Sequence, residues 1–209
     1  MLRVEHLKIA GLPPMSFAVA DGECLAVEGP SGSGKTRLLR AIADLDDVEG
    51  HIFLDGLERG EVSGPEWRRL VRYASAEPAW WSETPLQCFP RSARSEEERL
   101  ERLARSLGLQ GKLLDRPVAL LSTGERQRLA LMRALADEPR VLLLDEPTAA
   151  LDSANAALVE ELIRYQTLAG RSVLLVSHDA DQIARLAHAR LQLAPPATAA
   201  AARRGEAGA

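Results

Sequence analysis

The feature that most constrains the fold is a glycine-rich stretch at residues 29–36, which reads Gly29-Pro30-Ser31-Gly32-Ser33-Gly34-Lys35-Thr36. It fits the phosphate-binding pattern G-x-x-x-x-G-K-[ST], in which glycines let the backbone wrap closely around a phosphate. An apolar run at residues 24–27 precedes it, and residues 38–43 follow with apolar side chains at helical spacing. This strand–loop–helix order predicts an α/β fold with a nucleoside triphosphate site, where Lys35 reaches the β- and γ-phosphates and Thr36 holds Mg²⁺.

Composition narrows the class of protein. The 209 residues are 46% hydrophobic and carry a formal charge of −4, which suits one globular domain and gives no reason to expect nucleic-acid binding. No apolar stretch approaches the roughly 20 residues that span a bilayer, and we find no signal-peptide pattern. We therefore expect a protein that is cytosolic or peripheral to a membrane, with a single domain at residues 1–194 and a disordered Ala- and Pro-rich tail at 195–209.

Strands and helices alternate along most of the chain. Apolar runs at 141–144 and 172–176 fit central strands that are buried on both faces. A short helix is expected at 66–70, and helical periodicity marks residues 34–45, 95–107, 122–136, 153–168 and 179–187. Residues 1–28 are interpreted as antiparallel strands with a hairpin turn at Asp21-Gly22. The alternation implies a parallel sheet that is covered by helices and binds ligands beyond the carboxyl ends of its strands.

Polar motifs stand at the ends of both buried runs. Asp145 and Glu146 close the first run, where one carboxylate can hold Mg²⁺ through water and the other can accept a proton from a water that attacks the γ-phosphate. We assign the metal role to Asp145, opposite Thr36, and the proton-accepting role to Glu146. His178 follows the second run, where a histidine can hydrogen-bond the γ-phosphate.

A further motif has two interpretations. The helical segment at 122–136 opens with Ser122, Thr123, Gly124 and Glu125. Ser122 and Glu125 have the spacing of a capping box, in which each side chain bonds the backbone N–H of the other residue. A helix N-terminus with serine and glycine also forms an anion site, because free N–H groups remain there. The two roles can coexist, so the sequence leaves both open.

Together these motifs resemble those of the ATP-binding-cassette (ABC) ATPases, a family of P-loop NTPases. The likeness covers essentially residues 1–193 and rests on four motifs in the family's order and spacing, GPSGSGKT, LSTGERQR, VLLLDEPTAALD and VSHD. It implies a parallel-sheet core, an antiparallel β subdomain and a helical subdomain at about residues 79–135. It also implies ATP and Mg²⁺ as cofactors, with Lys35, Glu146 as general base and His178 as a γ-phosphate switch forming the catalytic set.

The resemblance also implies how the chain assembles. Two copies, or this chain and a related one, would pair head to tail, with each ATP held between one protomer's phosphate loop and residues 122–125 of the other. Leu151 and Asp152 would cross the dimer seam. A separate polytopic membrane subunit would bind the pair, so that the chain acts as a peripheral ATPase at the cytoplasmic face of the cell membrane and powers movement of a solute.

Other branches of the family resemble this chain less. DNA-organising members split the core with a long coiled coil and translation factors carry two cassettes, whereas this chain has one short cassette. An inactive scaffold is disfavoured by the intact Lys35, Asp145, Glu146 and His178. The short cassette and the stretch 152–192 are similar to the ATP-binding subunits of small iron-type metal exporters, with a generic importer or efflux system as the alternative. The solute and the direction of transport stay open.

The sequence departs from the family pattern at several positions. The family places a glutamine near residues 74–76, and here Ala76 stands at that position with a side chain that cannot ligate Mg²⁺. Whether the neighbouring Glu77 substitutes for it is left open. Thr123 and Glu125 replace the commoner glycine and glutamine. The aromatic side chain that often stacks on adenine is absent near residues 10–12.

Two adjacent tryptophans, Trp80 and Trp81, follow the Ala76 position. In transporters of the family this loop forms a groove that receives a short helix of the membrane subunit, and tryptophan is favoured in interface cores. We therefore expect Trp80 or Trp81 to contact the membrane subunit. Packing inside the helical subdomain is the alternative.

Overall fold

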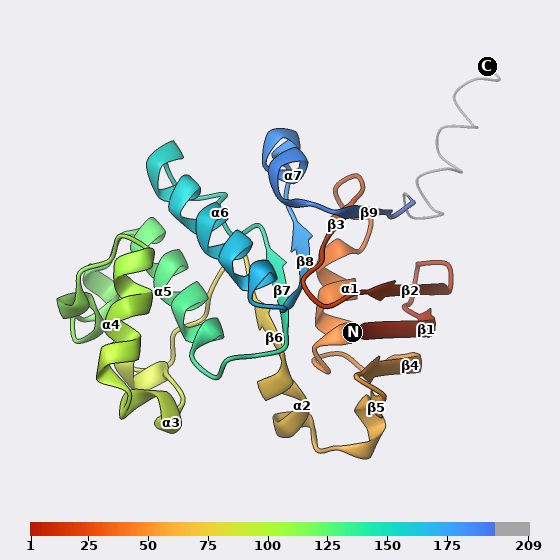
Figure 1. Cartoon of the computed structure of the whole chain (residues 1–209), viewed down its shortest axis with the longest axis horizontal. Coiled ribbons are helices and arrows are strands. Elements are labelled where there is room, and N and C mark those ends of the chain that lie inside the picture. Colours follow the sequence, from red (N-terminus) through yellow and green to blue (C-terminus); the bar gives the residue numbers. More distant parts are fainter. Residues whose placement is uncertain (195–209) are drawn as a thin grey trace.

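The computed structural model describes residues 1–194 and contains two sheets (Figure 1). The smaller sheet is antiparallel, with the order β2-β1-β4-β5. Its strands are β1 (Leu2–Lys8), β2 (Met15–Val19), β4 (Glu49–Leu54) and β5 (Leu57–Glu58). The turn between β4 and β5 is made by Asp55 and Gly56, which both have positive φ as a tight hairpin requires. This sheet is the expected antiparallel β subdomain.

The larger sheet is parallel, with the order β6-β7-β8-β3-β9. Its strands are β3 (Cys24–Glu28), β6 (Val71–Ala74), β7 (Val141–Asp145), β8 (Ser172–Val176) and β9 (Ala189–Gln192). Every residue of β7 and β8 is buried, as expected of central strands. One expectation is wrong. Because β3 pairs in parallel with β8 and β9, the turn at Asp21-Gly22 carries the chain between sheets and is not a hairpin.

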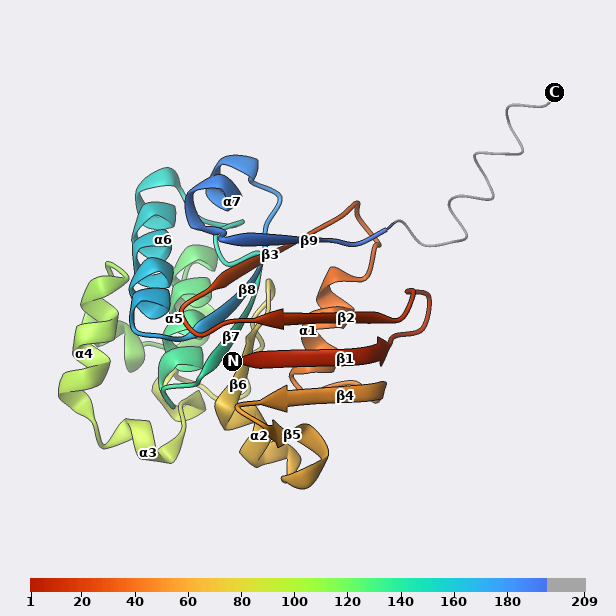
Figure 2. The ribbon, with the colours of Figure 1, turned by 45° about the vertical axis from the view of Figure 1, so that its right-hand side comes forward.

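Alternate residues of the central strands pack into two separate apolar clusters, one on each face of the parallel sheet. On one face, Leu143 and Leu174 pack with α1 (Lys35–Ile42) and with the buried side of β1. On the other face, Leu142 and Leu144 pack with helices of the second layer, which include α6 (Ser153–Leu168). Figure 2 shows β2, β1 and β4 side by side, with α1 close to them. The helix α1 is thereby sandwiched between the two sheets.

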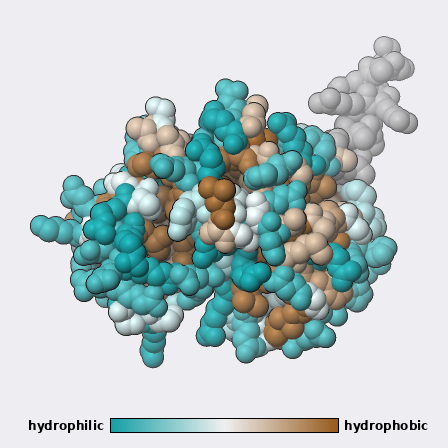
Figure 3. Space-filling model, viewed as in Figure 1, coloured by the Kyte–Doolittle hydropathy of each residue, from teal (hydrophilic) through white to brown (hydrophobic). Residues whose placement is uncertain are grey.

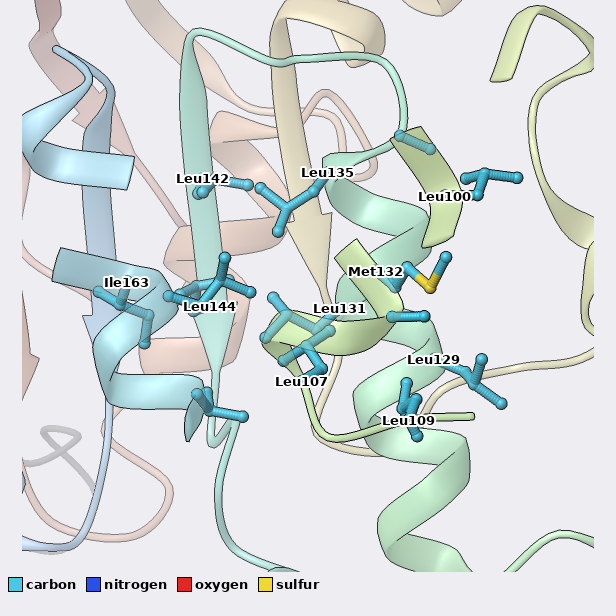
Figure 4. Packing of buried hydrophobic residues seen from close by; sticks show 14 of the residues in the cluster. Leu100, Leu107, Leu109, Leu129, Leu131, Met132, Leu135, Leu142, Leu144 and Ile163 are labelled. Carbon is cyan, nitrogen blue, oxygen red and sulfur yellow. The ribbon is translucent and has the colours of Figure 1, made fainter. Parts of the chain in front are cut away.

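The helical subdomain lies at the end of the molecule remote from the antiparallel sheet (Figure 1). It contains α3 (Arg91–Arg94), α4 (Glu97–Ser106), α5 (Thr123–Leu135) and 3₁₀ turns at Leu86–Cys88, Gly111–Leu114 and Val118–Leu120. Its apolar core is continuous with that of the parallel sheet, since Leu131 and Leu135 of α5 lie in the same cluster as Leu142 and Leu144 of β7 (Figure 4). This packing fixes α5 against the sheet that carries Asp145.

The remaining described elements are two seven-residue helices, α2 (Gly64–Leu70) and α7 (Ala180–Leu186), and a 3₁₀ turn at Arg59–Glu61. The helix α2 begins two residues before the expected position. Ser63 and Glu66 form a capping box, and Pro65 sits in the first turn, where its missing N–H is no loss. Residues 64 and 65, which lie outside the expected range, therefore belong to the helix.

The surface in Figure 3 is largely hydrophilic, with hydrophobic side chains in small groups. Among residues 1–194 no helix has both the length and the apolar character required to cross a bilayer. The tail expected at 195–209 lies outside the described residues.

Candidate functional site

The glycine-rich loop joins the end of β3 to the start of α1, and close contacts restrict its backbone conformation. Gly34 caps α1 in a left-handed conformation with φ of 90°, and a Cβ there would lie 2.8 Å from a methyl carbon of Leu12. The ammonium group of Lys35 is buried within the loop, where it donates to the carbonyl oxygens of Gly29 at 2.8 Å and Pro30 at 3.2 Å. The loop thus presents free N–H groups of the first turn and one buried cation, which together suit an anion.

Asp145, at the carboxyl end of β7, faces the first turn of α1. Its Oδ2 accepts hydrogen bonds from the hydroxyl of Thr36 at 2.7 Å and from the hydroxyl of Tyr73 at 3.0 Å. Mg²⁺ prefers oxygen ligands such as hydroxyl and carboxylate oxygens, and in such sites phosphates and water complete the coordination. The two side chains that the sequence assigns to the metal therefore lie together and have suitable chemistry.

Glu146 sits immediately beyond β7 in a conformation that favours glycine, with φ of 50°. Its N–H donates to the Val176 carbonyl of β8 at 3.0 Å, which ties the residue to the neighbouring strand. The carboxylate accepts from the backbone N–H of His178 at 3.3 Å, and the imidazole Nε2 lies 3.3 Å from the other carboxylate oxygen. Burial raises the pKa of Glu146, while His178 acts in the opposite direction. A carboxylate in this environment is a stronger base than an exposed one.

These groups share a cavity of about 330 Å³ beyond the strand ends, which we call the nucleotide cavity. It is lined by Ala76, Asp145, Glu146, Val176, His178 and residues 31–37 of the loop and α1. Ala76 faces this cavity and adds no polar group, whereas Glu77 lines a different hollow. The geometry therefore gives no support to Glu77 as a substitute for the missing glutamine.

Ser122 lies at the N-cap of α5 and forms the expected capping box. Its hydroxyl accepts from the N–H of Glu125 at 3.1 Å, and the Glu125 carboxylate accepts from the N–H of Ser122 at 2.7 Å, which lowers the pKa of Glu125. Residues 122–125 do not line the nucleotide cavity of their own chain. Within the protomer the motif therefore acts as a helix cap.

The loop 148–152 lies beside this cap. Leu151 has a methyl carbon 3.1 Å from the place that a Cβ of Gly124 would occupy, so glycine allows the close approach. Asp152 caps α6 by accepting from the N–H of Asn155 at 2.9 Å. The structure thus places Leu151 of the loop 148–152 next to residues 122–125, and the expected dimer seam would need these two segments to be close together.

One residue that the sequence analysis did not single out, Gln127, connects the loop 148–152 to Glu146. Its amide nitrogen donates to the Glu146 carbonyl at 2.7 Å, and its amide oxygen accepts from the N–H of Ala150 at 3.3 Å. Gln127 is only 5% exposed. Two signals in the sequence mark it: Gln127 lies within the motif LSTGERQR, and it is a polar side chain four residues before Leu131, on the buried face of the helix.

The two tryptophans have different environments. Trp80 is half-buried against the core of the helical subdomain, and Trp81 is 67% exposed. The guanidinium of Arg133 lies 4.5 Å from the ring centroid of Trp80 and 4.7 Å from that of Trp81. Trp80 therefore fits the packing alternative, while Trp81 is free to meet a partner.

Trp81 lines a hollow of about 850 Å³ between the parallel sheet and the helical subdomain, which we call the arginine groove. Its lining includes six arginines, namely Arg40, Arg68, Arg69, Arg72, Arg94 and Arg133, but only two acids, Glu77 and Asp137. Burial lowers the pKa of Arg133, and the neighbouring Arg72 acts in the same direction. Among the described residues, Arg69, Arg94 and Arg133 form no ion pair with a carboxylate. The groove therefore has an excess of positive charge.

Comparisons with known proteins agree with this geometry. A family model described as "ABC transporter" matches residues 12–149. The lipoprotein-releasing system ATP-binding protein LolD of Aquifex aeolicus (strain VF5) is 36% identical over 211 residues, which cover 92% of this chain and 93% of the relative. The "Probable iron export ATP-binding protein FetA" of Escherichia coli (strain K12) is 35% identical over 180 residues, 81% of this chain and 78% of the relative.

Other relatives are longer, and the chain spans 34 to 59% of three of them. Among solved structures, a dimeric ATP-binding cassette in a post-hydrolysis state with ADP and phosphate superposes with a TM-score of 0.80 at 23% identity, over 92% of this chain and 94% of that one. The match in fold, the relatives and the family model lead to one conclusion: the chain belongs to the ABC transporter family, as an ATP-binding and ATP-hydrolysing subunit.

Proposed function

We propose that the chain binds ATP with Mg²⁺ in the nucleotide cavity and hydrolyses it to ADP and phosphate. The observation that carries this proposal is the meeting of Thr36 with Asp145, 109 residues later in the chain, in the cavity that Lys35 and Glu146 also reach. Bound ATP would place its β- and γ-phosphates in the loop, where Lys35 would exchange its two carbonyl contacts for phosphate oxygens. Thr36 and Asp145 would hold Mg²⁺, which neutralises charge on the phosphates when bound.

We assign Glu146 as the general base that accepts a proton from the attacking water. Its carboxylate lies beside the loop and would accept one proton as the water oxygen forms its bond to the γ-phosphorus and the bond to the bridging oxygen of ADP breaks. The backbone tie to Val176 and the contact with His178 hold the carboxylate in place. His178, which is exposed beside it, would contact the γ-phosphate and report its presence.

A second protomer would complete the site. The capping box uses the N–H groups of Ser122 and Glu125, and the N–H groups of Thr123 and Gly124 lie outside their own cavity, where an anion bound to another chain would accept from them. A head-to-tail pair, whether homodimer or heterodimer, would set them against the γ-phosphate bound to the partner's loop, with Leu151 and Asp152 at the seam. The dimeric state of the cassette with the similar fold supports this arrangement.

The arginine groove would receive a separate polytopic membrane subunit, so that the chain works at the cytoplasmic face of the cell membrane. Trp81 offers an exposed aromatic ring at the groove, and the unpaired arginines favour an acidic segment in the partner. The two relatives carry names for lipoprotein release and iron export. Their named cargoes differ and cargo would contact the membrane subunit, so we assign no solute to this chain.

The test is Glu146→Gln, with Glu161→Gln on the exposed surface of α6 as the matched control. Glu146→Gln should bind ATP with the affinity of the parent chain but lose hydrolysis, because the amide cannot accept the proton. ATP should then hold the variant as a dimer in size-exclusion chromatography. Normal turnover in Glu146→Gln would refute the assignment, and Glu161→Gln should behave like the parent chain.

A further inference from the structure

The segment 73–77 forms part of the wall of two hollows. Ala76 faces the nucleotide cavity, whereas Tyr73, Ala74, Ser75 and Glu77 face the arginine groove. With alanine at position 76, no polar side chain from this segment lines the nucleotide cavity. A polar contact from the segment to the proposed metal site nevertheless exists, and it comes from the groove side.

That contact is made by Tyr73. The residue lies in β6, in parallel register with Leu143 of β7, and its hydroxyl lies 3.0 Å from Asp145 Oδ2. The same oxygen accepts from Thr36 at 2.7 Å. A phenol hydroxyl carries a proton that it can donate, whereas a carboxylate can only accept, so the direction of this hydrogen bond is from Tyr73 to Asp145.

We propose that Tyr73 is a positioning residue for Mg²⁺: its hydroxyl holds the Asp145 carboxylate facing Thr36, in place of any contact from position 76. Two donors on one carboxylate oxygen restrict rotation of the side chain, so Asp145 needs less reorganisation when the ion binds. Outer-sphere hydrogen bonds of this kind commonly change metal affinity by about 10- to 100-fold. This inference rests on the proposed assignment of Thr36 and Asp145 to the metal.

The variant that isolates the hydroxyl is Tyr73→Phe, which keeps the ring in its packing site. The chain offers a matched control, because it contains only one other tyrosine, Tyr165, which is 65% exposed on α6. Binding of a fluorescent ATP analogue would be measured in EDTA and then across a Mg²⁺ titration, for the parent chain, Tyr73→Phe and Tyr165→Phe. Thermal unfolding of each variant would confirm that it is folded.

We expect all three proteins to bind the analogue equally in EDTA, since the loop itself is unchanged. Tyr73→Phe should then need about tenfold more Mg²⁺ for the half-maximal gain in affinity, while Tyr165→Phe should match the parent. A purely structural role for Tyr73 would weaken binding in EDTA as well, or would lower the unfolding temperature without moving the Mg²⁺ midpoint.

The outcomes separate the two proposals. An unchanged Mg²⁺ midpoint in Tyr73→Phe, in a parent chain that binds nucleotide with Mg²⁺, would overturn the role of Tyr73 alone. No nucleotide binding by the parent chain would overturn the proposed function and this inference with it. Replacing Mg²⁺ by Mn²⁺ and following free Mn²⁺ by electron paramagnetic resonance gives a second readout, in which the same loss of metal affinity is expected.

Discussion

The nucleotide cavity and the arginine groove share the segment 73–77 as a wall, yet they handle buried charge differently. The cavity combines Lys35 with Asp145 and Glu146, and burial raises the pKa of Glu146. The groove concentrates one sign of charge, and burial lowers the pKa of both Arg72 and Arg133. The charges of the cavity are nearly balanced within the chain. In the groove, three of the six arginines (Arg69, Arg94 and Arg133) have no ion-pair partner among the described residues, and under the proposed function carboxylates of the membrane subunit would pair with them.

The two regions differ in what constrains their side chains: the ligand's chemistry in the cavity, and the surface of the proposed partner in the groove. A triphosphate is the same in every protein, so the groups that bind it must be of fixed type and position. A protein partner varies, so a docking groove is built from whatever side chains complement it. Substitutions in the cavity should therefore change nucleotide binding or hydrolysis in the isolated chain, and those in the groove should not, apart from substitution of Tyr73, whose hydroxyl reaches Asp145.

The largest effect is expected for Lys35→Ala. Removing the buried ammonium takes away a charge-assisted contact to the phosphates, which is worth about 1.5–3 kcal/mol, so ATP affinity should fall by roughly 10- to 100-fold. Titration calorimetry with ATP measures the loss. Lys112→Ala is the matched control, because Lys112 is exposed in the helical subdomain and should bind ATP like the parent chain. Equal ATP affinity in Lys35→Ala and Lys112→Ala would contradict the assignment of Lys35 to phosphate binding.

The next effect separates the two tryptophans on the groove side. Trp80→Ala should lower the free energy of unfolding by about 2 kcal/mol, because only part of its ring is buried against the subdomain core. Trp81→Ala should stay within about 1 kcal/mol, since only the contact with Arg133 is lost. Denaturant unfolding measures both. If Trp81→Ala were the more destabilising, the exposed ring would be a structural element and not a docking residue.

Sequence reasoning predicted the cavity well for a physical reason. Parallel strands end at the same edge, so Asp145, Glu146 and His178 had to gather near the phosphate loop, whatever the intervening structure. It also predicted α6 at 153–168 because the apolar period there is regular. It misassigned the turn at Asp21-Gly22, because a short-range turn signal does not say which sheet the next strand joins.

Side-chain contacts between elements that are distant in the chain could not be predicted from the sequence. Gln127 gains its role from two hydrogen bonds across the fold, and Tyr73 gains its role from one. Gln127 stands in the motif LSTGERQR, but the motif does not show which residues it contacts, and Tyr73 stands in no motif. The groove was inferred only as a loop with two tryptophans, since its arginines come from four separate stretches of the chain. Such features depend on packing between elements, which local periodicity does not encode.

The smallest effect concerns the pH dependence of hydrolysis, and it tests the cavity's charge balance directly. Only the ionised Glu146 carboxylate can accept the proton, so the rate should fall as the pH drops through its pKa. Since burial raises that pKa above the ordinary 4.5, the fall should begin at a higher pH than for an exposed glutamate. The imidazole of His178 acts to lower the pKa of Glu146, so His178→Gln should move the acid limb of kcat/KM to still higher pH, whatever its effect on the maximal rate. His51→Gln, at an exposed ion pair of the antiparallel sheet, should leave the limb where it is. A limb that stays fixed in His178→Gln would mean that a group other than Glu146 sets it, and the base assignment would then pass to that group.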